Sequence, residues 1–273
     1  MPIPVFVISL KDSAKRRAMI SRRLGELGVA FTFIDAVDGR VMSDAEADRL
    51  CPRRRRLSRR WPMSNREVAC SASHLAALRV IANGESPFGC ILEDDAVPED
   101  DFPSVLDATW LAGLPRFDLF KLGGDVNFKG DQLAAPVGVR GERHICTPLH
   151  PSYSARGYIA SREGARRVLD RSNPIVDTAD VFLFRAPFVP MSFLETRPFV
   201  VGNAGLPSTL NGDNYENSPM PWWRPPLAWL PYTLSTFSRK ARRYLAFISS
   251  RGVAGLFQIQ KIAVYPPPPA PAP

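Results

Sequence analysis

Short apolar runs alternate with segments of helical periodicity along most of the chain. The runs are rich in Val, Ile, Leu and Phe, a composition that is typical of buried strands. They cover residues 5–10, 29–34, 88–92, 117–122 and 157–160. The stretch from Phe188 to Val201 is also apolar, but its prolines favour edge strands over central ones.

The segments between the apolar runs carry helix signals. Asp12 or Ser13 can cap a helix that ends at Gly28, and Ser43 and Ser64 each precede a glutamate by three residues. That spacing is a capping box, in which the serine and the glutamate satisfy free N–H groups of the first turn. Further helices are predicted over 64–81, 103–110 and 161–169. Strands that alternate with helices, without an internal repeat, predict an α/β sandwich.

Three segments lack both patterns. The arginine-rich stretch that ends at Trp61 is expected to form a surface loop, and residues 126–150 a flexible loop over the site. Past about residue 215 the composition shifts to Pro, Trp and Arg, and the prolines at 266–273 predict a disordered polyproline-type tail. The sequence therefore divides into a domain at 1–214, an aromatic and basic segment at 215–265, and the tail.

The composition places the chain among proteins with an ordinary core. The apolar fraction is 45% over 273 residues. No stretch approaches the ~20 apolar residues of a spanning helix, and the first strand begins where a signal peptide would stand. The four cysteines, Cys51, Cys70, Cys90 and Cys146, form no CxxC pair. We therefore expect reduced thiols in a cytosolic protein.

The formal charge of +8 is concentrated in two basic blocks. One is the arginine run at 53–60, and the other, at 239–243, lies between aromatic segments at 221–232 and 244–248. Aromatic rings mixed with cations suit an anionic membrane surface. The alternative is a C-terminal helix that docks on the domain itself. Because the chain has no recognised nucleic-acid-binding module, no nucleic acid partner is expected.

The apolar run that starts at Phe88 ends in three consecutive acids, Glu93, Asp94 and Asp95. Adjacent carboxylates repel one another, and a hard divalent cation, which prefers oxygen ligands, relieves that repulsion. A cation held by one or two carboxylates keeps positions open for substrate phosphates. The triplet therefore predicts a metal and diphosphate site at the carboxyl edge of the sheet. The alternative is an acidic helix start, because further acids follow at 99–101.

Six short motifs follow one another in a fixed order. They cover residues 5–10, 15–17, 33–39, 67–74, 91–96 and 157–165. In this order they resemble glycosyltransferase family 25, the bacterial lipopolysaccharide and lipooligosaccharide galactosyltransferase-type enzymes, which are related to collagen galactosyltransferases. The resemblance runs from residue 3 to about residue 205, and it leaves out the arginine block and everything past about residue 215.

The resemblance implies a GT-A-like fold, in which a Rossmann-like nucleotide-binding half is fused to an acceptor half. It implies transfer of a hexose, galactose or glucose, from a UDP-sugar to a glycan or lipid-linked glycan such as lipopolysaccharide, with inversion at the anomeric carbon. The triplet corresponds to the DxD-type motif, so Asp95 and Glu93 would hold Mn²⁺ or Mg²⁺. Ser9 stands where family members often carry Asn. Such an enzyme is expected in the cytoplasm, or as a peripheral protein on the inner face of the cytoplasmic membrane.

Several side chains near the predicted strand ends are candidates for contacts with the donor. Arg16 and Arg17 can place a cation near a phosphate, and a solvated helix face is the alternative. Asp35 and Asp38 suit ribose or base contacts, or a plain turn. His74 is either a hydrogen-bonded core residue or a donor-site contact. The full set of donor candidates is Ser9, Leu10, Arg16, Arg17, Asp35, Ala36, Asp38, His74, Glu93 and Asp94.

An inverting transfer needs a general base that accepts the proton of the acceptor hydroxyl. Asp177 and Asp180 are the first candidates, and Asp125 is the next. No GxSxG or Cys/His pattern indicates a covalent route. Two other classes of protein stay open: an inactive fold that binds a membrane or another polyanion, and a metal-dependent phosphohydrolase that uses the same acids on a nucleotide.

Overall fold

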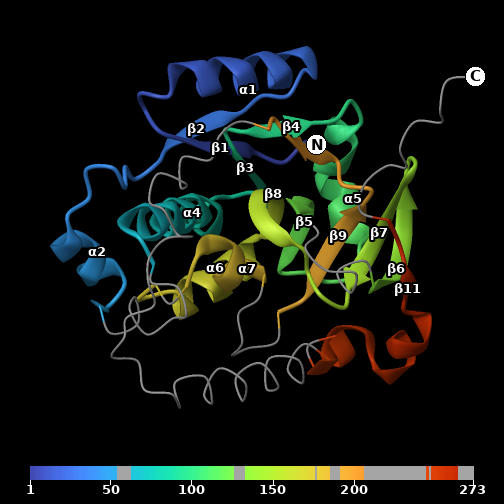
Figure 1. Ribbon diagram of the computed structural model, residues 1–273. Helices are drawn as coiled ribbons and strands as arrows, with labels where there is room; N and C mark the ends of the chain where they lie inside the picture. The colour runs from blue at the N-terminus through green and yellow to red at the C-terminus, as the bar shows by residue number, and fades with distance from the viewer. Residues whose placement is uncertain are drawn as a thin grey trace, which may run out of the picture.

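The computed structural model describes residues 1–53, 63–125, 133–175, 177–184, 191–205, 244–245 and 247–263 (Figure 1). The predictions made for the arginine-rich stretch at 54–60, the Trp-rich stretch at 221–232, the basic block at 239–243 and the proline tail lie outside these residues.

The described residues form a mixed α/β fold on one large sheet, so the predicted fold class is confirmed. From edge to edge, its strands are β11 (Gln260–Lys261), β6 (Leu133–Arg140), β7 (Arg143–Pro148), β9 (Phe193–Arg197), β5 (Leu119–Asp125), β8 (Tyr153–Ser161), β3 (Phe88–Glu93), β1 (Val5–Ser9) and β2 (Thr32–Asp35).

The N-terminal part of the sheet is parallel. β1 lies between β2 and β3 and runs parallel to both, with Ser9 opposite Asp35 and Ile8 opposite Glu93. β1 and β3 form where the sequence has continuous apolar runs, because both of their faces are covered. Since β2 and β3 flank β1 on opposite sides, the winding of the chain reverses between β1 and β3. Open α/β sheets bind ligands at such a point, and this Rossmann-like half is what the resemblance implies.

The rest of the sheet is mixed. β8 pairs antiparallel with β3 and with β5, and β9 lies between β5 and β7. The prediction of edge strands over 188–201 is therefore wrong for β9, which is central. Its ladder is uninterrupted because Pro198 comes after its last residue, Arg197. A separate small sheet pairs β10 (Val201–Asn203) with β4 (Ala96–Pro98), directly after the acidic triplet.

The prediction of an irregular loop over 126–150 is wrong for the residues from 133 onward. They form the hairpin β6–β7, which turns at Gly141 with φ at +58°. Strand signals are weak here because Pro136 and Gly138 interrupt the apolar alternation. The structure accommodates these two residues with a register shift between them.

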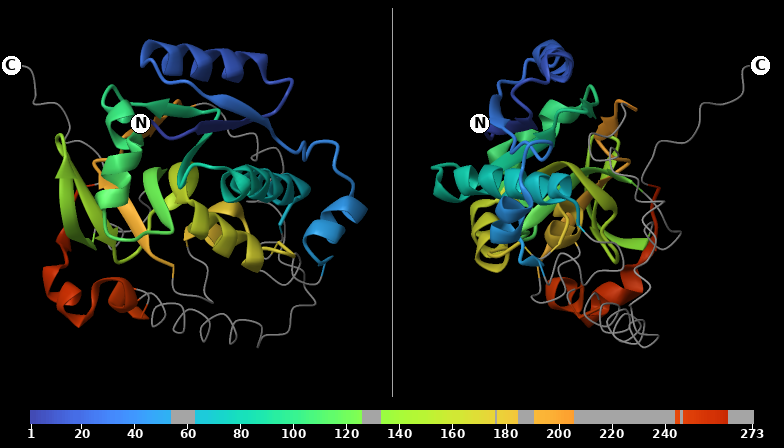
Figure 2. Two further views of the ribbon diagram at one scale, coloured as in Figure 1. Left: turned by 180° about the vertical axis from the view of Figure 1, so that it is seen from behind. Right: turned by 60° about the vertical axis from the view of Figure 1, so that its left-hand side comes forward.

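Helices cover both faces of the sheet (Figures 1 and 2). One core cluster lies under α4 (Asn65–Asn83), α6 (Arg162–Arg171) and α7 (Ala179–Phe184), and the other under α1 (Ala14–Glu26), η1 (Phe102–Leu106) and α5 (Ala108–Gly113). The capping boxes at Ser43 and Ser64 are confirmed; they open α2 (Asp44–Leu50) and α4. The helix predicted over 103–110 is divided, because Asp107 is extended and caps α5 by accepting a hydrogen bond from the N–H of Trp110.

The described part of the C-terminal segment packs on the domain. Phe247 is buried in a cluster with Ala135 and Leu149, and β11 pairs with β6. Between them, η5 (Val253–Gln258) leaves Phe257 89% exposed. For these residues the structure matches the docked alternative to a membrane segment. No helix in the described ranges combines the length and apolarity needed to span a bilayer.

Candidate active site

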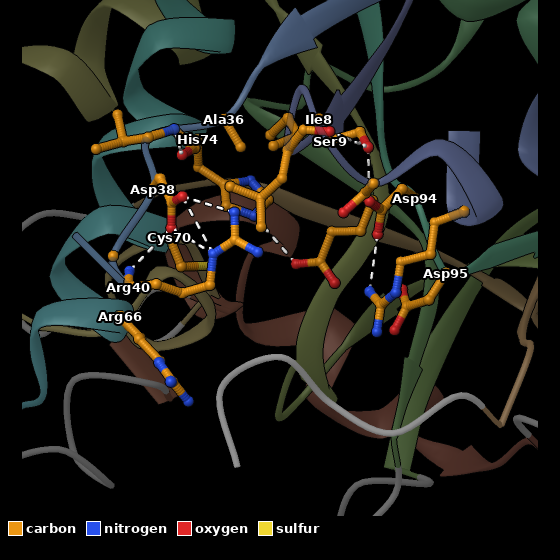
Figure 3. Close-up of a pocket in the computed structure, with 17 residues that line it drawn as sticks. Ile8, Ser9, Ala36, Asp38, Arg40, Arg66, Cys70, His74, Asp94 and Asp95 are labelled. Atoms are coloured by element: carbon orange, nitrogen blue, oxygen red, sulfur yellow. Dashed lines mark hydrogen bonds and ion pairs between the residues drawn. The ribbon is translucent and has the colours of Figure 1, made fainter. Parts of the chain in front are cut away.

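A pocket opens at the carboxyl ends of the three parallel strands (Figure 3). The end of β1 forms one wall, the loop after β2 the next, and the acidic triplet after β3 the third. α4 closes the pocket with Arg66, Cys70, Ser73 and His74. The pocket therefore lies at the switch point between β1 and β3, which is where an open α/β sheet binds its ligand.

The loop after β2 is held against α4 by a close backbone contact. Ser73 Oγ accepts a hydrogen bond from the N–H of Val37 at 2.9 Å. A Cβ atom at Gly39 would overlap the Cα atom of Arg66 and lie 3.0 Å from the Cβ atom of Ala69. The turn at Asp38-Gly39 therefore needs glycine for steric reasons, which its sequence alone does not show.

Asp38 lines the pocket next to Leu10 and Ala36, but its carboxylate is already paired. It accepts a hydrogen bond from Arg40 Nε at 2.8 Å, and Arg40 Nη2 also donates to Asp12 at 2.6 Å. The hydrogen bond from Arg40 lowers the pKa of Asp38. The aspartate thus carries a charge that fixes Arg40 at the rim, and a ribose contact through Asp38 would have to compete with this pair.

Asp94 is the most strongly fixed member of the acidic triplet. It accepts hydrogen bonds from Ser9 Oγ at 2.7 Å and from Arg16 Nη1 at 2.9 Å. Three of the predicted donor residues are therefore in contact, although they come from β1, α1 and the end of β3. The pairing directs Arg16 to the pocket wall, where the alternative of a solvated helix face does not hold.

Arg17 ties the ends of β1 and β2 together. It donates to the carbonyl oxygens of Leu10 at 3.1 Å and Ser9 at 3.0 Å, and it pairs with the Asp35 carboxylate. Its guanidinium lies 4.5 Å from the ring centroid of Phe33. The hydrogen bond from Arg17 lowers the pKa of Asp35. The described residues that line the pocket do not include this pair, so its position favours a structural role.

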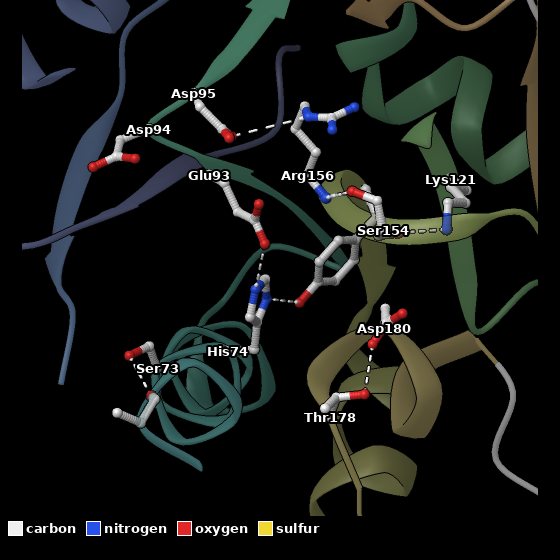
Figure 4. Close-up of polar contacts among 12 residues, drawn as sticks. Ser73, His74, Glu93, Asp94, Asp95, Lys121, Ser154, Arg156, Thr178 and Asp180 are labelled. Atoms are coloured by element: carbon white, nitrogen blue, oxygen red, sulfur yellow. Dashed lines mark hydrogen bonds and ion pairs between the residues drawn. The ribbon is translucent and has the colours of Figure 1, made fainter. Parts of the chain in front are cut away.

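Glu93 and His74 form a buried hydrogen-bonded chain with Tyr158 (Figure 4). His74 Nε2 lies 3.1 Å from Glu93 Oε1, and His74 Nδ1 lies 3.0 Å from the Tyr158 hydroxyl. Burial by itself would raise the pKa of Glu93, but the hydrogen bond and charge of His74, aided by more distant cations, lower it. The carboxylate is therefore held in its charged form, and His74 is fixed from both sides of its ring.

Asp95 faces Arg156, a residue that sequence reasoning missed. Arg156 Nε lies 3.9 Å from Asp95 Oδ1, and Arg156 Nη2 donates to Asp125 Oδ2 at 3.3 Å. Among the described side chains, Asp95 Oδ1 and Arg156 Nε are buried without a hydrogen-bond partner. Burial, reinforced by the charge of Glu93, raises the pKa of Asp95 to about 6. The only signal for Arg156 in the sequence is a cation inside an apolar strand.

The candidate bases lie in two places. Asp125 ends β5 and pairs with Arg156. Asp180 begins α7 and accepts a hydrogen bond from Thr178 Oγ1 at 2.7 Å, while the carbonyl oxygen of Asp177 accepts one from Ser71 of α4. Figure 4 places Asp180 on the α4 side of the site and Arg156 beside Asp95. Tertiary structure therefore places Asp125 beside Arg156, which faces Asp95, and Asp180 on α7, which packs with α4.

The triplet fits a hard divalent cation. Asp95 Oδ1 is a buried carboxylate oxygen that lacks a hydrogen bond, and Glu93 has a second oxygen besides the one that contacts His74. Oxygen ligands of this kind suit Mg²⁺ and Mn²⁺. Asp94 is less suited to direct coordination, because both of its oxygens already accept hydrogen bonds.

Comparison with known proteins shows which proteins this chain is similar to. The family model described as glycosyltransferase family 25 (LPS biosynthesis protein) matches residues 2–136. The chain is 31% identical over 175 residues to the lacto-N-neotetraose biosynthesis glycosyltransferase LgtE of Neisseria meningitidis serogroup B, a match that covers 60% of this chain and 59% of that protein. It is 28% identical over 176 residues to procollagen galactosyltransferase 1-B of Xenopus laevis, covering 61% of this chain and 28% of that protein.

Among solved structures, the fold is similar to the galactosyltransferase LgtC in complex with donor and acceptor sugar analogs. That likeness has a TM-score of 0.30 and 12% sequence identity, and it covers 67% of this chain and 70% of that one.

The family model and the matching relatives make this chain similar to glycosyltransferases. More narrowly, residues 2–136 match glycosyltransferase family 25, so the resemblance seen in the sequence is confirmed. The chain spans just under three fifths of the length of its bacterial relative LgtE and a little over a quarter of its procollagen relative.

Proposed function

We propose that this protein transfers a hexose, galactose or glucose, from a UDP-sugar to a glycan acceptor of lipopolysaccharide or another cell-surface polysaccharide, with inversion at the anomeric carbon. The observation that carries the proposal is the pocket at the β1/β3 switch point, closed by an acidic triplet whose Asp95 Oδ1 is buried without a hydrogen bond. The match of residues 2–136 to a glycosyltransferase family supports the reaction class.

Asp95 and the second oxygen of Glu93 would hold Mn²⁺ or Mg²⁺. When bound, the ion supplies positive charge that stabilises the diphosphate as a leaving group. The residues around it hold this site in place: Ser9 and Arg16 fix Asp94, while His74 fixes Glu93. This arrangement leaves Asp95 as the member of the triplet with a buried oxygen that accepts no hydrogen bond from a described residue.

Cations around the pocket suit a nucleotide diphosphate. Arg16, Arg40 and Arg66 line the pocket together with the acids. A guanidinium binds phosphate oxygens with paired N–H groups, so these arginines would orient the donor. Leu10 and Ala36 line the same pocket and offer apolar surface against which a base can pack.

The general base would come from one of two regions. Asp180 lies on the α4 side of the triplet and Asp125 on the Arg156 side. An inverting base must be placed on the face of the sugar opposite the leaving diphosphate. The two aspartates lie in different regions of the site, and they can be told apart by substituting each in turn.

We place the enzyme in the cytoplasm, in peripheral contact with the inner face of the cytoplasmic membrane. The exposed apolar side chains of Leu245, Val253 and Phe257 on the docked C-terminal segment support this contact. The formal charge of +8 favours an anionic lipid surface.

The first experiment measures binding of a panel of nucleotide sugars to the purified chain, with Mn²⁺ and with EDTA. We expect one UDP-sugar to bind in a metal-dependent way. Asp95→Ala should weaken that binding by roughly 100-fold, because it removes an oxygen ligand of the ion. The matched control is Asp100→Ala, which removes an exposed acid that pairs with Arg23 outside the pocket.

Other outcomes contradict the proposal. Equal donor binding by wild type and Asp95→Ala would remove the triplet from the site. Release of phosphate from a nucleotide without any acceptor would favour the phosphohydrolase. Binding of polyanions, with no donor bound under either condition, would favour the inactive fold.

A further inference from the structure

Besides the carboxylate oxygens, the pocket contains a second set of metal-ligand atoms of different chemistry. We propose that Cys70, His74 and Glu93 form a binding site for a thiophilic divalent cation of the Zn²⁺ type, with its fourth coordination position open to the pocket. One thiol sulfur, one imidazole nitrogen and one carboxylate oxygen are the ligands that zinc prefers. The proposal concerns metal binding and does not depend on sugar transfer.

The three ligands come from two elements that face each other. Cys70 and His74 are four residues apart on α4, so they lie on the same face of that helix. Glu93 ends β3 and meets them across the pocket. The sulfur, nitrogen and oxygen atoms all lie within 4.8 Å of one another. In the part of the chain that the structure describes, no other three such side chains come together in this way.

The spacing of the ligand atoms agrees with tetrahedral coordination. His74 Nε2 and Glu93 Oε1 are 3.1 Å apart. A tetrahedral zinc ion holds nitrogen and oxygen ligands at ~2.0 Å, which separates those two atoms by roughly 3.3 Å. For this pair of atoms, the existing hydrogen bond could therefore be replaced by two coordinate bonds with only a small movement of His74 and Glu93.

Tyr158 supplies a hydrogen bond to the ring nitrogen of His74 that would not bind the ion. Its hydroxyl lies 3.0 Å from His74 Nδ1, and the residue is fully buried against the ring of His74. With an ion bound, Nδ1 would donate its proton to the tyrosine oxygen, and Nε2, which lies 3.1 Å from Glu93 Oε1 (Figure 4), would be the unprotonated nitrogen that binds the ion. An outer hydrogen bond of this kind fixes the tautomer and the ring orientation of a metal-binding histidine.

The local charge also favours a cation. A thiolate and a carboxylate together neutralise a divalent ion, which matters at a buried site. Without an ion, burial raises the pKa of the Cys70 thiol, and the charges of Glu93 and Asp180 raise it further. The ion must therefore displace the thiol proton when it binds.

The other cysteines provide matched controls. None of the four cysteines forms a disulfide. Cys146 lies in β7 and is buried among Ala134 and Ile262, away from the pocket. A serine at position 146 would change a buried thiol without touching the proposed ligands.

The test is a Co²⁺ titration of the full-length, metal-free protein, monitored by optical absorption, without any sugar donor. Wild type should bind about one equivalent and develop the thiolate-to-cobalt charge-transfer band together with strong visible bands of four-coordinate cobalt. Cys70→Ser should lose the thiolate band, and Cys146→Ser should keep it. Tyr158→Phe should bind Co²⁺ more weakly by 10- to 100-fold, because it loses only the outer hydrogen bond.

Two results would overturn the site. One is the absence of a thiolate band in wild type, and the other is its persistence in Cys70→Ser. Should Cys70→Ser fail to fold by circular dichroism, Glu93→Gln serves instead: it keeps a hydrogen bond to His74 but should reduce Co²⁺ affinity. The Co²⁺ titration contains no sugar donor, so a negative result there would not contradict the proposed transferase activity. A negative result in the donor-binding experiment would likewise not contradict this metal site.

Discussion

At the scale of single residues, the site is defined by a buried carboxylate oxygen of Asp95 and the buried guanidinium of Arg156. The two groups face each other but lie too far apart to form a hydrogen bond. Asp95 Oδ1 and Arg156 Nε are 3.9 Å apart, and among the described atoms neither has a hydrogen-bond partner. An unsatisfied buried polar group costs ~1–3 kcal/mol. A ligand that offers a cation or a donor would satisfy Asp95 Oδ1, and an acceptor oxygen of a ligand would satisfy Arg156 Nε.

The raised pKa of Asp95 leads to a stability prediction for the metal-free protein. Its pKa rises from 3.8 to about 6, so the folded state holds this proton more tightly than the unfolded chain does. Stability is therefore lost as pH rises from about 4 through about 6. Asp95→Asn should remove that loss and gain on the order of 2 kcal/mol above about pH 6, a gain that fades as pH falls toward 4.

The measurement is urea unfolding of both proteins in EDTA at about pH 4.5 and about pH 7.5. Asp100→Asn is the control, because it makes the same chemical change at an exposed carboxylate outside the pocket. Equal pH profiles for wild type and Asp95→Asn would mean that the Asp95 carboxylate is solvated in the folded protein.

At the scale of elements, the close approach of the loop after β2 to α4 shapes the pocket. Gly39 permits that approach, and Ser73 holds it through the N–H of Val37. The same helix carries His74 and Cys70. A displacement of this loop would therefore change the pocket wall while leaving the ligands on α4 in place.

Gly39→Ala should destabilise the protein by about 1–3 kcal/mol and weaken donor binding, because the added Cβ overlaps the backbone of Arg66. The matched control is Gly25→Ala in α1, where a Cβ meets nothing within 4 Å. That change should be neutral or stabilising by up to ~1 kcal/mol, since alanine favours helix. Thermal unfolding and donor titration measure both effects. If the two variants behaved alike, the steric role of Gly39 would be wrong.

At the scale of the whole molecule, the docked C-terminal segment presents apolar side chains to solvent. Phe247 anchors the segment, while Phe257 and Val253 of η5 point outward. In Figure 1 this segment lies at the opposite end of the molecule from α1. Contact with a membrane through this surface would therefore leave α1 and the parallel strands away from the bilayer.

The double change Phe257→Ser with Val253→Ser should weaken binding to anionic phospholipid vesicles and leave stability nearly unchanged, because both side chains are exposed. Val41→Ser, an exposed residue in the loop after β2, is the control. Vesicle sedimentation at low salt measures the difference. Equal sedimentation of the double variant and wild type would exclude η5 as the membrane contact.

The sequence by itself determined the local elements and one site. The apolar runs specified β1 and β3, and the capping boxes specified α2 and α4, because each signal lies within a few residues. The acidic triplet marked the carboxyl edge of the parallel strands for the same reason. The ordered motifs then indicated a family that the comparison confirmed.

The tertiary structure decided everything that depends on contacts between distant segments. The partnership of His74 with Tyr158 spans 84 residues, and Arg156 meets Asp95 only because β8 pairs with β3. The central position of β9 depends on its neighbours β5 and β7 and not on its own composition. Side-chain type and spacing can name the groups that carry chemistry, but strand pairing and helix packing determine which of them touch.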